Sequence, residues 1–370
     1  MYTHRRSETK VQSTFEKSSD FVRNEWRRAR GKPLSYLWFK LRWNRWPAYR
    51  VVPKFPLNVD IEVSSACNLR CDHCFRQYMD VGENSLMPLD MFKTIARECG
   101  RYGLYTLKFS MRGEPTLHPQ LPEMVAFAKE NEIKEVWINT HGGNLTADLA
   151  ERLMKAGPDW ITVSFDGLGA MYESIRKPLK YEESLEKLKL LRRCRDLFHP
   201  GCLINVQTLW SAIKDDPEAY HRTMTPLVDR ISFNADMNFK EIMLVPDDDF
   251  VCPRLWQRIA ITSRGHFLKC PSDFQMEEIL GNVSQMTIKE AWDQRQHQQR
   301  LRHLAGRKSE STVCRKCHHG AKKVARAVAI QDGRIDGFDI VYQKEFSGVG
   351  LNRQSDEQPK PGDQSGLILH

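Results

Sequence analysis

The chain has 370 residues, and 56 Lys and Arg against 47 Asp and Glu give it a formal net charge of +9. No run of eighteen apolar residues occurs, which excludes a helix that spans a membrane. The first twenty residues are polar and of mixed charge, so no secretory signal is expected. Most of the ten cysteines stand at metal-ligand spacings, which predicts a reducing, cytoplasmic location rather than disulfides.

Residues 1–54 are predicted to be a basic, tryptophan-rich extension. Between Val22 and Arg50 there are nine Lys or Arg, one acid and four of the nine tryptophans, so this stretch carries +8 of the net charge. The pattern is typical of a helix at a lipid headgroup boundary and predicts peripheral membrane contact through residues 22–50. Two other interpretations stay open: binding of an anionic substrate near the active-site mouth, or a helix packed on the fold with its basic side chains in water.

From residue 55 onward, short apolar strands alternate with amphipathic helices. Strands are predicted near residues 57, 106, 135, 160, 203 and 230. Helices with apolar residues at three- and four-residue spacing are predicted over Leu89–Tyr102, Pro119–Asn131, Ala147–Gly157 and Tyr181–Phe198. Six such units predict the α/β class and a partial (β/α)6 TIM-type barrel over residues 55–240.

Three cysteines, Cys67, Cys71 and Cys74, follow the first predicted strand, Leu57–Val63, in a C-x3-C-x2-C run. Three thiolates cannot complete four-coordinate zinc, but they can hold three irons of a four-iron cluster and leave the fourth iron open. The loop after a strand is also where α/β barrels keep their active sites. The run therefore predicts a reactive iron-sulfur site, with a zinc knuckle or buried thiols as the alternative.

This cysteine spacing resembles the cluster motif of the radical S-adenosylmethionine (SAM) superfamily. The resemblance implies that the open iron binds SAM and that reductive cleavage of SAM gives a 5'-deoxyadenosyl radical, which takes hydrogen from a substrate. It also implies a flavodoxin or ferredoxin as the electron donor. The residue before the third cysteine, usually aromatic in the family, is His73 here, and its implied role is stacking on adenine.

A second motif, Met111-Arg-Gly-Glu-Pro115, follows the second predicted strand. It resembles the Gly-Gly-Glu-Pro segment of the same family, with Arg112 in place of the first glycine. The resemblance implies that Gly113 and Glu114 bind the ammonium group of SAM, a task that suits a carboxylate at the carboxyl end of a strand.

Further SAM contacts are implied at later strand ends. By resemblance, Thr140 lies where related enzymes contact the SAM carboxylate, and Ser164 with Arg176 lies where they contact the ribose and carboxylate. An ordinary loop role is the alternative for each. No catalytic residue is assigned, and the candidates for a proton acceptor or substrate clamp are His118, His141, Asp166, Arg176, Asn234 and Asp236.

Residues 241–342 contain a second group of four cysteines: Cys252, Cys270, Cys314 and Cys317. Two strand-like runs within Trp256–Cys270 predict a β-hairpin, and a helix is predicted over Thr287–Arg302. The order of these features resembles the "twitch" or short SPASM extension of radical SAM enzymes, and implies one auxiliary 4Fe-4S cluster on the four cysteines. Zinc remains the alternative, because four thiolates also suit a tetrahedral zinc ion.

Residues 343–370 are rich in Gln, Pro, Gly, Ser and Asp and are predicted to be disordered.

The remaining cysteines, Cys99, Cys194 and Cys202, bear on the reaction. A radical epimerase needs a thiol beside the substrate, but these three fall late in outer helices or at the start of the fifth strand, away from strand carboxyl ends. We therefore expect electron removal: oxidation of a sugar- or cyclitol-like secondary alcohol, with an electron passing to the auxiliary cluster. The cysteine pattern is similar to that of single-cluster aminocyclitol dehydrogenases.

The sequence leaves two other functions open. A maturase of ribosomally made peptides shares the barrel and cysteine-rich tail, but it commonly has a longer leader-binding segment and a second auxiliary cluster. A basic RNA-binding module explains the tryptophan-rich segment but not the cysteines, and no nucleic acid partner is expected. The expected partners are a small-molecule substrate of carbohydrate type and the reductant.

Overall fold

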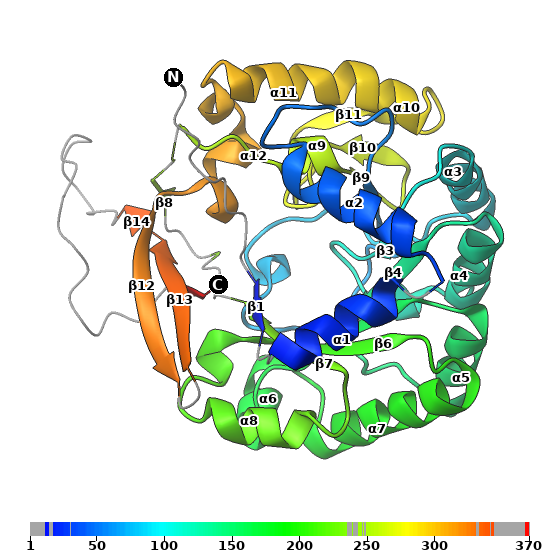
Figure 1. Cartoon of the computed structure of the whole chain (residues 1–370), viewed down its shortest axis with the longest axis vertical. Helices are drawn as coiled ribbons and strands as arrows, with labels where there is room; N and C mark the ends of the chain where they lie inside the picture. The colour runs from blue at the N-terminus through cyan, green and yellow to red at the C-terminus, as the bar shows by residue number, and fades with distance from the viewer. Residues whose placement is uncertain are drawn as a thin grey trace.

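The computed structural model describes residues 12–14, 18–29, 31–234, 239, 243–245, 247, 249–330, 333–340, 342–343 and 367–369. Its centre is one ten-stranded sheet in the order β1-β7-β6-β5-β4-β3-β2-β9-β10-β11 (Figure 1). The strands are β1 (Gln12–Thr14), β2 (Asn58–Ile61), β3 (Thr106–Phe109), β4 (Glu135–Thr140), β5 (Trp160–Ser164), β6 (Leu203–Leu209), β7 (Arg230–Asn234), β9 (Arg258–Ile261), β10 (His266–Leu268) and β11 (Ile279–Asn282).

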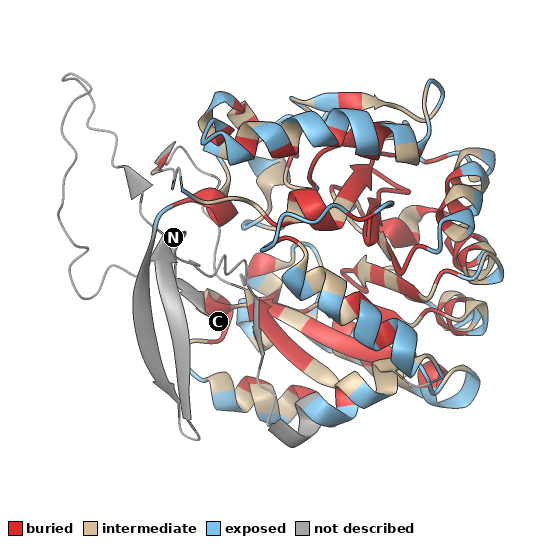
Figure 2. Ribbon diagram, turned by 45° about the horizontal axis from the view of Figure 1, so that its top comes forward, coloured by how far each residue is buried: buried red, intermediate tan, exposed pale blue. Residues whose placement is uncertain are grey.

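The six strands from β2 to β7 are parallel neighbours, and helices cover their outer side (Figures 1 and 2). The crossover helices are α3 (Leu89–Arg101), α4 (Leu121–Glu130), α5 (Ala147–Ala156), α6 (Gly169–Ile175), α7 (Tyr181–Phe198) and α8 (Pro217–Met224). The predicted partial barrel of six β/α units is therefore confirmed. The four helices expected from periodicity correspond to α3, α4, α5 and α7, whereas the short α6 and α8 were not expected.

Strand alternation gives the barrel two different faces. Val59 and Ile61 of β2 are fully buried and belong to the hydrophobic core beneath the helices, together with Phe92 of α3. Burial of each such side chain stabilises the fold by about 1.5–3 kcal/mol. Because neighbouring side chains of a strand point to opposite faces, Asn58 and Asp60 face the inside of the barrel.

Two helices, α1 (Ser18–Ala29) and α2 (Pro33–Arg45), lie across the end of the barrel where the strands begin (Figure 1). Arg27 pairs with Asp229, just before β7, at 2.6 Å, and Arg28 pairs with Glu135, the first residue of β4, at 3.0 Å. This end is opposite the strand carboxyl ends. The expectation that this segment could hold an anionic substrate near the barrel mouth is therefore wrong, and several of its basic side chains pair with barrel carboxylates instead of only reaching water.

The C-terminal part continues the barrel sheet. Strand β9 pairs in parallel with β2, and β10 and β11 follow it in antiparallel order. The predicted hairpin within Trp256–Cys270 is present as β9 and β10, but it extends the sheet instead of standing apart. The helix predicted over Thr287–Arg302 is divided into α10 (Ile288–Glu290), a π-helical turn (Ala291–Arg295) and α11 (Gln296–Leu304).

The remaining elements are β8 (Met243–Leu244), α9 (Arg254–Gln257), α12 (Thr312–Arg315), β12 (Lys323–Ile330), β13 (Gly333–Ile340), β14 (Tyr342–Gln343) and β15 (Leu367–Leu369). Strand β15 pairs with β13, and β14 pairs with β8. Of the tail expected to be disordered, only residue 343 in β14 and the strand β15 are described, and the rest of it lies outside the described residues. Among the helices that the structure describes, none is long and apolar enough to cross a membrane.

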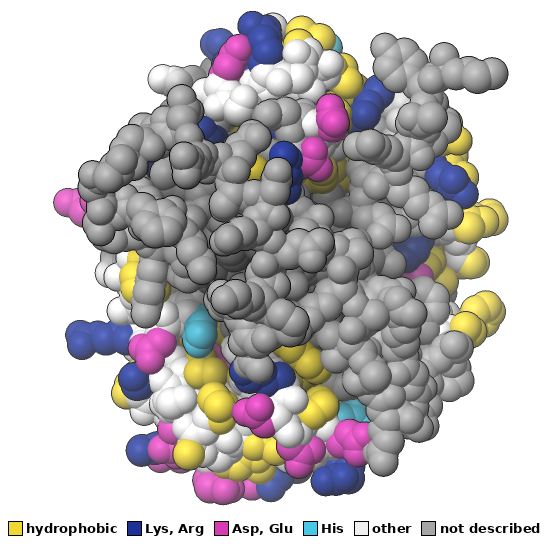
Figure 3. Space-filling model, turned by 90° about the vertical axis from the view of Figure 1, so that its left-hand side faces the viewer, with side chains coloured by type: hydrophobic (Ala, Val, Ile, Leu, Met, Phe, Trp, Pro, Cys, Tyr) yellow, Lys and Arg dark blue, Asp and Glu magenta, His cyan; other side chains and the backbone are white. Residues whose placement is uncertain are grey.

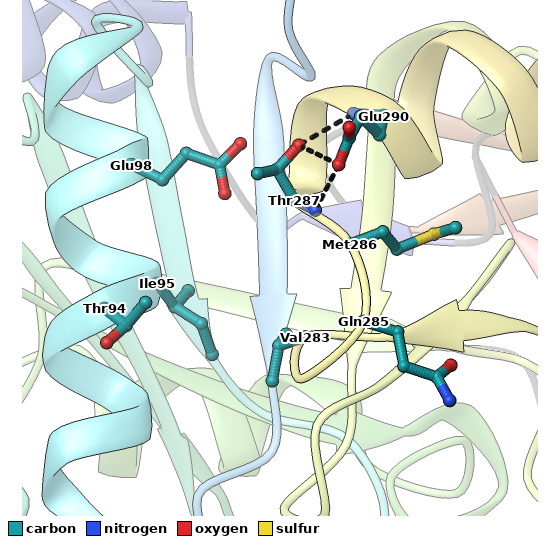
Figure 4. A pocket seen from close by; sticks show the side chains of 8 residues that line it. All are labelled: Thr94, Ile95, Glu98, Val283, Gln285, Met286, Thr287 and Glu290. Carbon is teal, nitrogen blue, oxygen red and sulfur yellow. Dashed lines mark hydrogen bonds between the residues drawn. The ribbon is translucent and has the colours of Figure 1, made fainter.

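A cavity of about 280 Å³ lies between α3 and the segment from β11 to α10 (Figure 4). Glu98 of α3 lines this cavity and accepts hydrogen bonds from the backbone N–H groups of Ile288 and Lys289, at 2.9 Å each. Its carboxylate thus caps α10 and ties the C-terminal part to the outside of the barrel. No cysteine lines this cavity, so it is a joint between two parts of the chain rather than part of either cysteine site.

Candidate functional site

The three cysteines that follow β2, called here the barrel cysteine group, lie on one loop at the mouth of the barrel. All three are free thiols and partly exposed. The pKa of the Cys71 thiol is raised to about 11, chiefly by burial and also by the neighbouring Cys74 and Cys67 thiols, against the lowering effect of Arg176. The thiols are thus close enough to influence one another. Three free thiols on one loop fit a cluster that leaves one iron without a protein ligand.

A buried ion pair stands beside this group. The Arg176 guanidinium contacts Asp166 at 2.5 Å, and its Nη1 lies 3.8 Å from the Cys71 Sγ. Burial alone would lower the pKa of Arg176, but Asp166 and Cys71 raise it above its usual value. Asp166 also accepts the backbone N–H of Leu209 at 2.9 Å, so Arg176 is held firmly. A fixed cation next to a thiolate stabilises the negative charge of a bound cluster.

Gly113 is the point where the two sequence motifs touch. A Cβ atom at this position would lie 2.2 Å from the carbonyl oxygen of Ser64 and 2.5 Å from that of Ala66. Only glycine lets the segment after β3 pack directly against the loop that carries the barrel cysteine group. The adjoining Glu114 N–H donates to the Ala66 carbonyl at 2.7 Å, which fixes this contact.

Glu114 is buried and accepts several hydrogen bonds. Its Oε1 accepts from the Thr116 and Thr140 hydroxyls, both at 2.6 Å, and its Oε2 accepts from the backbone N–H of His141 at 2.8 Å. The carboxylate therefore joins the ends of β3 and β4. This brings together Glu114 and Thr140, two of the residues expected at the SAM site, beside the cysteine loop.

Arg112, which replaces the first glycine of the expected motif, is accommodated by a partner that sequence reasoning missed. Its Nε and Nη2 donate to the two carboxylate oxygens of Glu62, each at 2.7 Å, and both side chains are buried. Glu62 also accepts from the hydroxyl of Ser263 at 3.0 Å. Glu62 lies just after β2 and Ser263 just after β9, so this network links the barrel mouth to the C-terminal part.

The other expected site residues do not share the hydrogen bonds that join Glu114 and Thr140. His73 is exposed on the cysteine loop, and Ser164 ends β5 with a partly exposed side chain. His118 is buried, with its Nε2 at 2.9 Å from the Met87 carbonyl and its Nδ1 accepting from the Gln120 N–H, so both ring nitrogens serve the local fold. Asn234 ends β7, and Asp236 lies outside the described residues.

His141 joins the cysteine loop to the end of β4. Its Nδ1 accepts the Gly143 N–H at 2.9 Å, which leaves Nε2 to donate to the Asn68 Oδ1, also at 2.9 Å. Burial lowers the pKa of His141, against the raising effect of Glu114, so the neutral form is favoured. Asn68 further donates to Asn144 at 2.9 Å. His141 therefore positions the loop between two of the three cysteines.

The second four cysteines, called here the auxiliary cysteine group, come together from three separate segments. The pKa of the Cys252 thiol is raised to about 12, chiefly by burial and also by Cys270 and Cys317, against the lowering effect of Arg254. The Cys314 thiol in turn raises the pKa of Cys317. No group of three or more His, Cys, Asp or Glu side chains in the described part of the chain is arranged to hold a single metal ion.

Hydrogen-bond donors surround the auxiliary cysteine group. Cys270 Sγ lies 3.9 Å from the Arg254 Nη1 and 3.4 Å from the backbone nitrogen of Ser272. Cys314 Sγ lies 3.4 Å from the Nε2 of His303, whose Nδ1 accepts from the Cys252 N–H at 3.5 Å. Burial lowers the pKa of His303 to about 4, so near neutral pH this ring is an uncharged Nε2–H donor. Four thiols with three such donors fit a bound iron-sulfur cluster.

A series of ring contacts runs from the residue after Cys74 to the residue after Cys317. Phe75, which directly follows Cys74, stacks on Phe274 with ring centroids 3.9 Å apart, and both pack edge-on against Phe239. Phe239 in turn contacts His318, the residue after Cys317, at 5.5 Å. The two groups are thus joined by packed apolar side chains.

Inside the barrel, sequence reasoning missed a polar layer. Asn139, Thr162 and Asn205 lie in register on β4, β5 and β6, while the alternate residues belong to the core beneath the helices. The Oδ1 atoms of Asn139 and Asn205 have no hydrogen-bond partner among the described residues. Nearer the strand starts, Trp137 and Trp160 stack at 4.8 Å. Period-two alternation of polar and apolar residues in a strand is the signal that could have revealed this layer.

These observations describe a partial β/α barrel with three cysteines on a loop at its mouth and a second group of four cysteines in the C-terminal part. Both groups fit iron-sulfur clusters. Comparison with known families agrees. Residues 61–208 match the radical SAM superfamily, and residues 252–318 match the iron-sulfur cluster-binding SPASM domain. The chain therefore carries a radical SAM domain followed by a SPASM-type iron-sulfur domain.

Individual relatives match only in part. The chain is 31% identical over 110 residues to the Fe-coproporphyrin III synthase of Methanosarcina barkeri, covering 30% of this chain and 27% of that protein. It is 34% identical over 153 residues to the GTP 3',8-cyclase of Chlorobaculum tepidum, covering 41% and 44%. Each match spans less than half of the relative's length.

A solved structure of similar fold is Streptococcus suis SuiB bound to S-adenosylmethionine. Its TM-score is 0.52 at 14% identity, with 81% of this chain and 82% of that chain covered. This likeness shows the fold alone.

Proposed function

We propose that this enzyme oxidises a secondary alcohol of a sugar- or cyclitol-like substrate inside the barrel. The observation that carries the proposal is the polar layer of Asn139, Thr162 and Asn205 near the stacked Trp137 and Trp160. Side-chain amides with unpartnered oxygens suit hydroxyl groups, while the stacked indoles and Arg28, which lies over both rings, form the floor below this layer.

In this proposal the barrel cysteine group holds the SAM-binding 4Fe-4S cluster and the auxiliary cysteine group holds one further 4Fe-4S cluster. When bound, these cofactors would supply an acceptor for a hydrogen atom and an acceptor for one electron. SAM and the alcohol would become methionine, 5'-deoxyadenosine and a ketone, with one proton released to the protein. Glu114, Thr140, Ser164, Arg176, Gly113 and His73 are the residues proposed to position SAM.

The spare thiols support oxidation over hydrogen return. Cys99, Cys194 and Cys202 all belong to the hydrophobic core beneath the helices, and Cys99 and Cys202 are fully buried. Burial raises the pKa of each of these thiols. All ten cysteines lie within the described residues, and none outside the two groups faces the inside of the barrel.

Lys108 is the side chain proposed to accept the hydroxyl proton. It lies on the inner face of β3, in register with Asp60 of β2 and Trp137 of β4. Burial lowers the pKa of Lys108 to about 8, with Asp60 opposing and Arg258 adding to the shift. A lysine that loses its proton this readily can act as a base near neutral pH.

The test is product analysis with the reconstituted enzyme. A polyol or aminocyclitol deuterated at its carbinol carbons should pass deuterium to 5'-deoxyadenosine and yield a ketone. The ketone-forming rate should rise as pH increases through about 8, because the base form of Lys108 is needed. Lys108→Met should lose the ketone and keep the iron content, whereas the exposed-site control Lys155→Met should keep both.

The competing function is modification of a ribosomally made peptide. If deuterium reached 5'-deoxyadenosine from a labelled peptide and from none of the polyols, the alcohol proposal would be rejected. If polyols transferred deuterium but Lys108→Met formed ketone at the normal rate, Lys108 would be rejected as the base and the alcohol proposal would stand.

A further inference from the structure

Helix α2 has an apolar outer face that nothing in the described structure covers. Leu34, Leu37, Trp38 and Leu41 follow the i, i+3, i+4, i+7 pattern and expose 82%, 67%, 52% and 45% of their surface. An isolated exposed leucine is ordinary, but a continuous apolar stripe along one helix marks an interaction site.

The opposite face of α2 packs against the barrel. Tyr36 and Phe39 are buried, and the Phe39 ring stacks on Tyr105 with centroids 4.0 Å apart. The backbone carbonyl of Trp43 accepts a hydrogen bond from Gln257 at 2.9 Å. These contacts fix the rotation of α2, so the stripe points away from the fold.

The stripe continues onto neighbouring segments. On α1, Val22 and Trp26 stand one turn apart and expose 64% and 72% of their surface. Beyond α2, Tyr49 is exposed by 61% and Val51 and Val52 by about two-fifths. Helices α1 and α2 contact each other, and both lie across the same end of the barrel (Figure 1). Exposed apolar side chains, with tryptophan and tyrosine among them, therefore lie on both helices and on the segment that follows them.

The α2 part of this surface is basic. Residues 33–54 contain five Lys or Arg and no Asp or Glu, and Glu25 of α1 pairs with Arg28 and Lys40. Arg42 lies with its guanidinium 5.6 Å from the Trp38 ring and 5.7 Å from the Trp46 ring, and Arg45 is exposed at the end of the stripe. By contrast, the side of the molecule seen in Figure 3 shows acidic and basic side chains intermingled among the described residues.

We propose that the outer face of α1 and α2 docks on an anionic lipid bilayer. Leucines would enter the acyl boundary, tryptophans would lie at headgroup depth, and arginines would reach lipid phosphates. A second copy of this chain is a poorer occupant, because a two-fold contact through α2 would place Arg42 and Arg45 opposite the same cations, while Glu25 of α1 is already paired with Arg28 and Lys40.

Docking in this way sets the orientation of the enzyme. The helix pair covers the end of the barrel where strands begin, as the pairs with Glu135 and Asp229 show. Both cysteine groups belong to the other end of the barrel or to its side, so they would face the aqueous phase while the enzyme rests on the bilayer.

The test is flotation of the purified holoenzyme with vesicles of phosphatidylcholine, alone or with about one-third phosphatidylglycerol. The wild-type protein should float with the anionic vesicles only, and more weakly as salt is raised. The double variant Leu37→Glu/Trp38→Glu should reduce the partition coefficient about tenfold or more, because it removes apolar burial and adds negative charge. Arg42→Gln/Arg45→Gln should reduce binding at low salt and weaken its salt dependence.

The matched control is Leu197→Glu/Phe198→Glu, an exposed Leu–aromatic pair at the end of α7 with 75% and 40% exposure. It should float as the wild type does. Iron content and circular dichroism check that each variant is folded. Absence of wild-type flotation, or equal flotation of the Leu37→Glu/Trp38→Glu variant, would overturn the proposal. A concentration-dependent dimer in analytical ultracentrifugation, lost in that variant, would assign the surface to a second copy instead.

Discussion

The two cysteine groups are built in different ways. The barrel cysteine group lies within eight residues of one loop and is partly exposed. Arg176 lies 3.8 Å from the Cys71 sulfur, and one backbone hydrogen bond reaches each of the other two thiols. The auxiliary cysteine group is assembled from three segments. Arg254 and Ser272 donate towards Cys270, His303 lies beside Cys314, and backbone hydrogen bonds reach the other two thiols. The first group leaves room for a further ligand, whereas the second supplies four thiols and a denser set of donors.

This difference indicates different tasks for the two sites. Hydrogen bonds and positive charge near cluster sulfurs stabilise the reduced, more negative form and raise the reduction potential. If each site held a cluster, as proposed above, the auxiliary site, with more donors, would be the better electron acceptor of the two. The exposed loop, with three thiols, would be the better place for a small molecule to reach an iron.

The largest expected effect comes from removing the barrel cysteine group. A Cys67→Ala/Cys71→Ala/Cys74→Ala variant should lose SAM cleavage entirely and fall from about eight to about four irons per chain, since the auxiliary site stays loaded. Iron and sulfide analysis with EPR of the anaerobically reconstituted protein measures this. Loss of all iron, with zinc on the remaining cysteines, would contradict an auxiliary cluster and remove the electron acceptor from the proposed reaction.

An intermediate effect is expected at Gly113. The added methyl of Gly113→Ala must push the cysteine loop away from Ser64 and Ala66, and overpacking of this kind costs about 1–3 kcal/mol. The barrel site should lose iron and SAM cleavage, while the auxiliary EPR signal persists. Gly201→Ala, where the nearest atom lies 3.6 Å from the new methyl, is the control and should change neither. A normal barrel cluster in Gly113→Ala would show that the loop is not held by this contact.

The smallest effect is expected at Arg254. Losing a charge-assisted hydrogen bond of about 1.5–3 kcal/mol corresponds to a potential shift on the order of 100 mV. Arg254→Gln should therefore lower the auxiliary reduction potential and leave the barrel potential unchanged in an EPR redox titration. Arg254→Lys keeps the charge and should shift it less, and the distant Arg264→Gln should not shift it. Equal potentials in all four proteins would mean that Arg254 does not reach the cluster.

The barrel cysteine group lies on one loop and the auxiliary cysteine group comes from three segments, and this difference decides how much of each site the sequence could predict. The barrel cysteine group could be recognised because its three members are local in sequence and follow a strand. The donors His303 and Arg254 could not, because their closeness to Cys314 and Cys270 depends on how α11 and α9 pack. The barrel architecture followed from apolar periodicity, but the polar inner layer and Lys108 were overlooked because only the apolar half of the strand pattern was used.

The pairing of β9 with β2 has a practical consequence for anyone who divides this chain. Residues 61–208 match one family and residues 252–318 another, which invites expression of the first part alone. Such a fragment, even if extended to include β2, would strip β2 of one of its two neighbours and leave the backbone N–H and C=O groups of Asn58–Ile61 that face β9 unpaired along an open edge. Open edges of apolar strands recruit other chains and aggregate. The two matched segments are therefore better regarded as one unit of folding. A shortened chain should keep both segments and the residues between them.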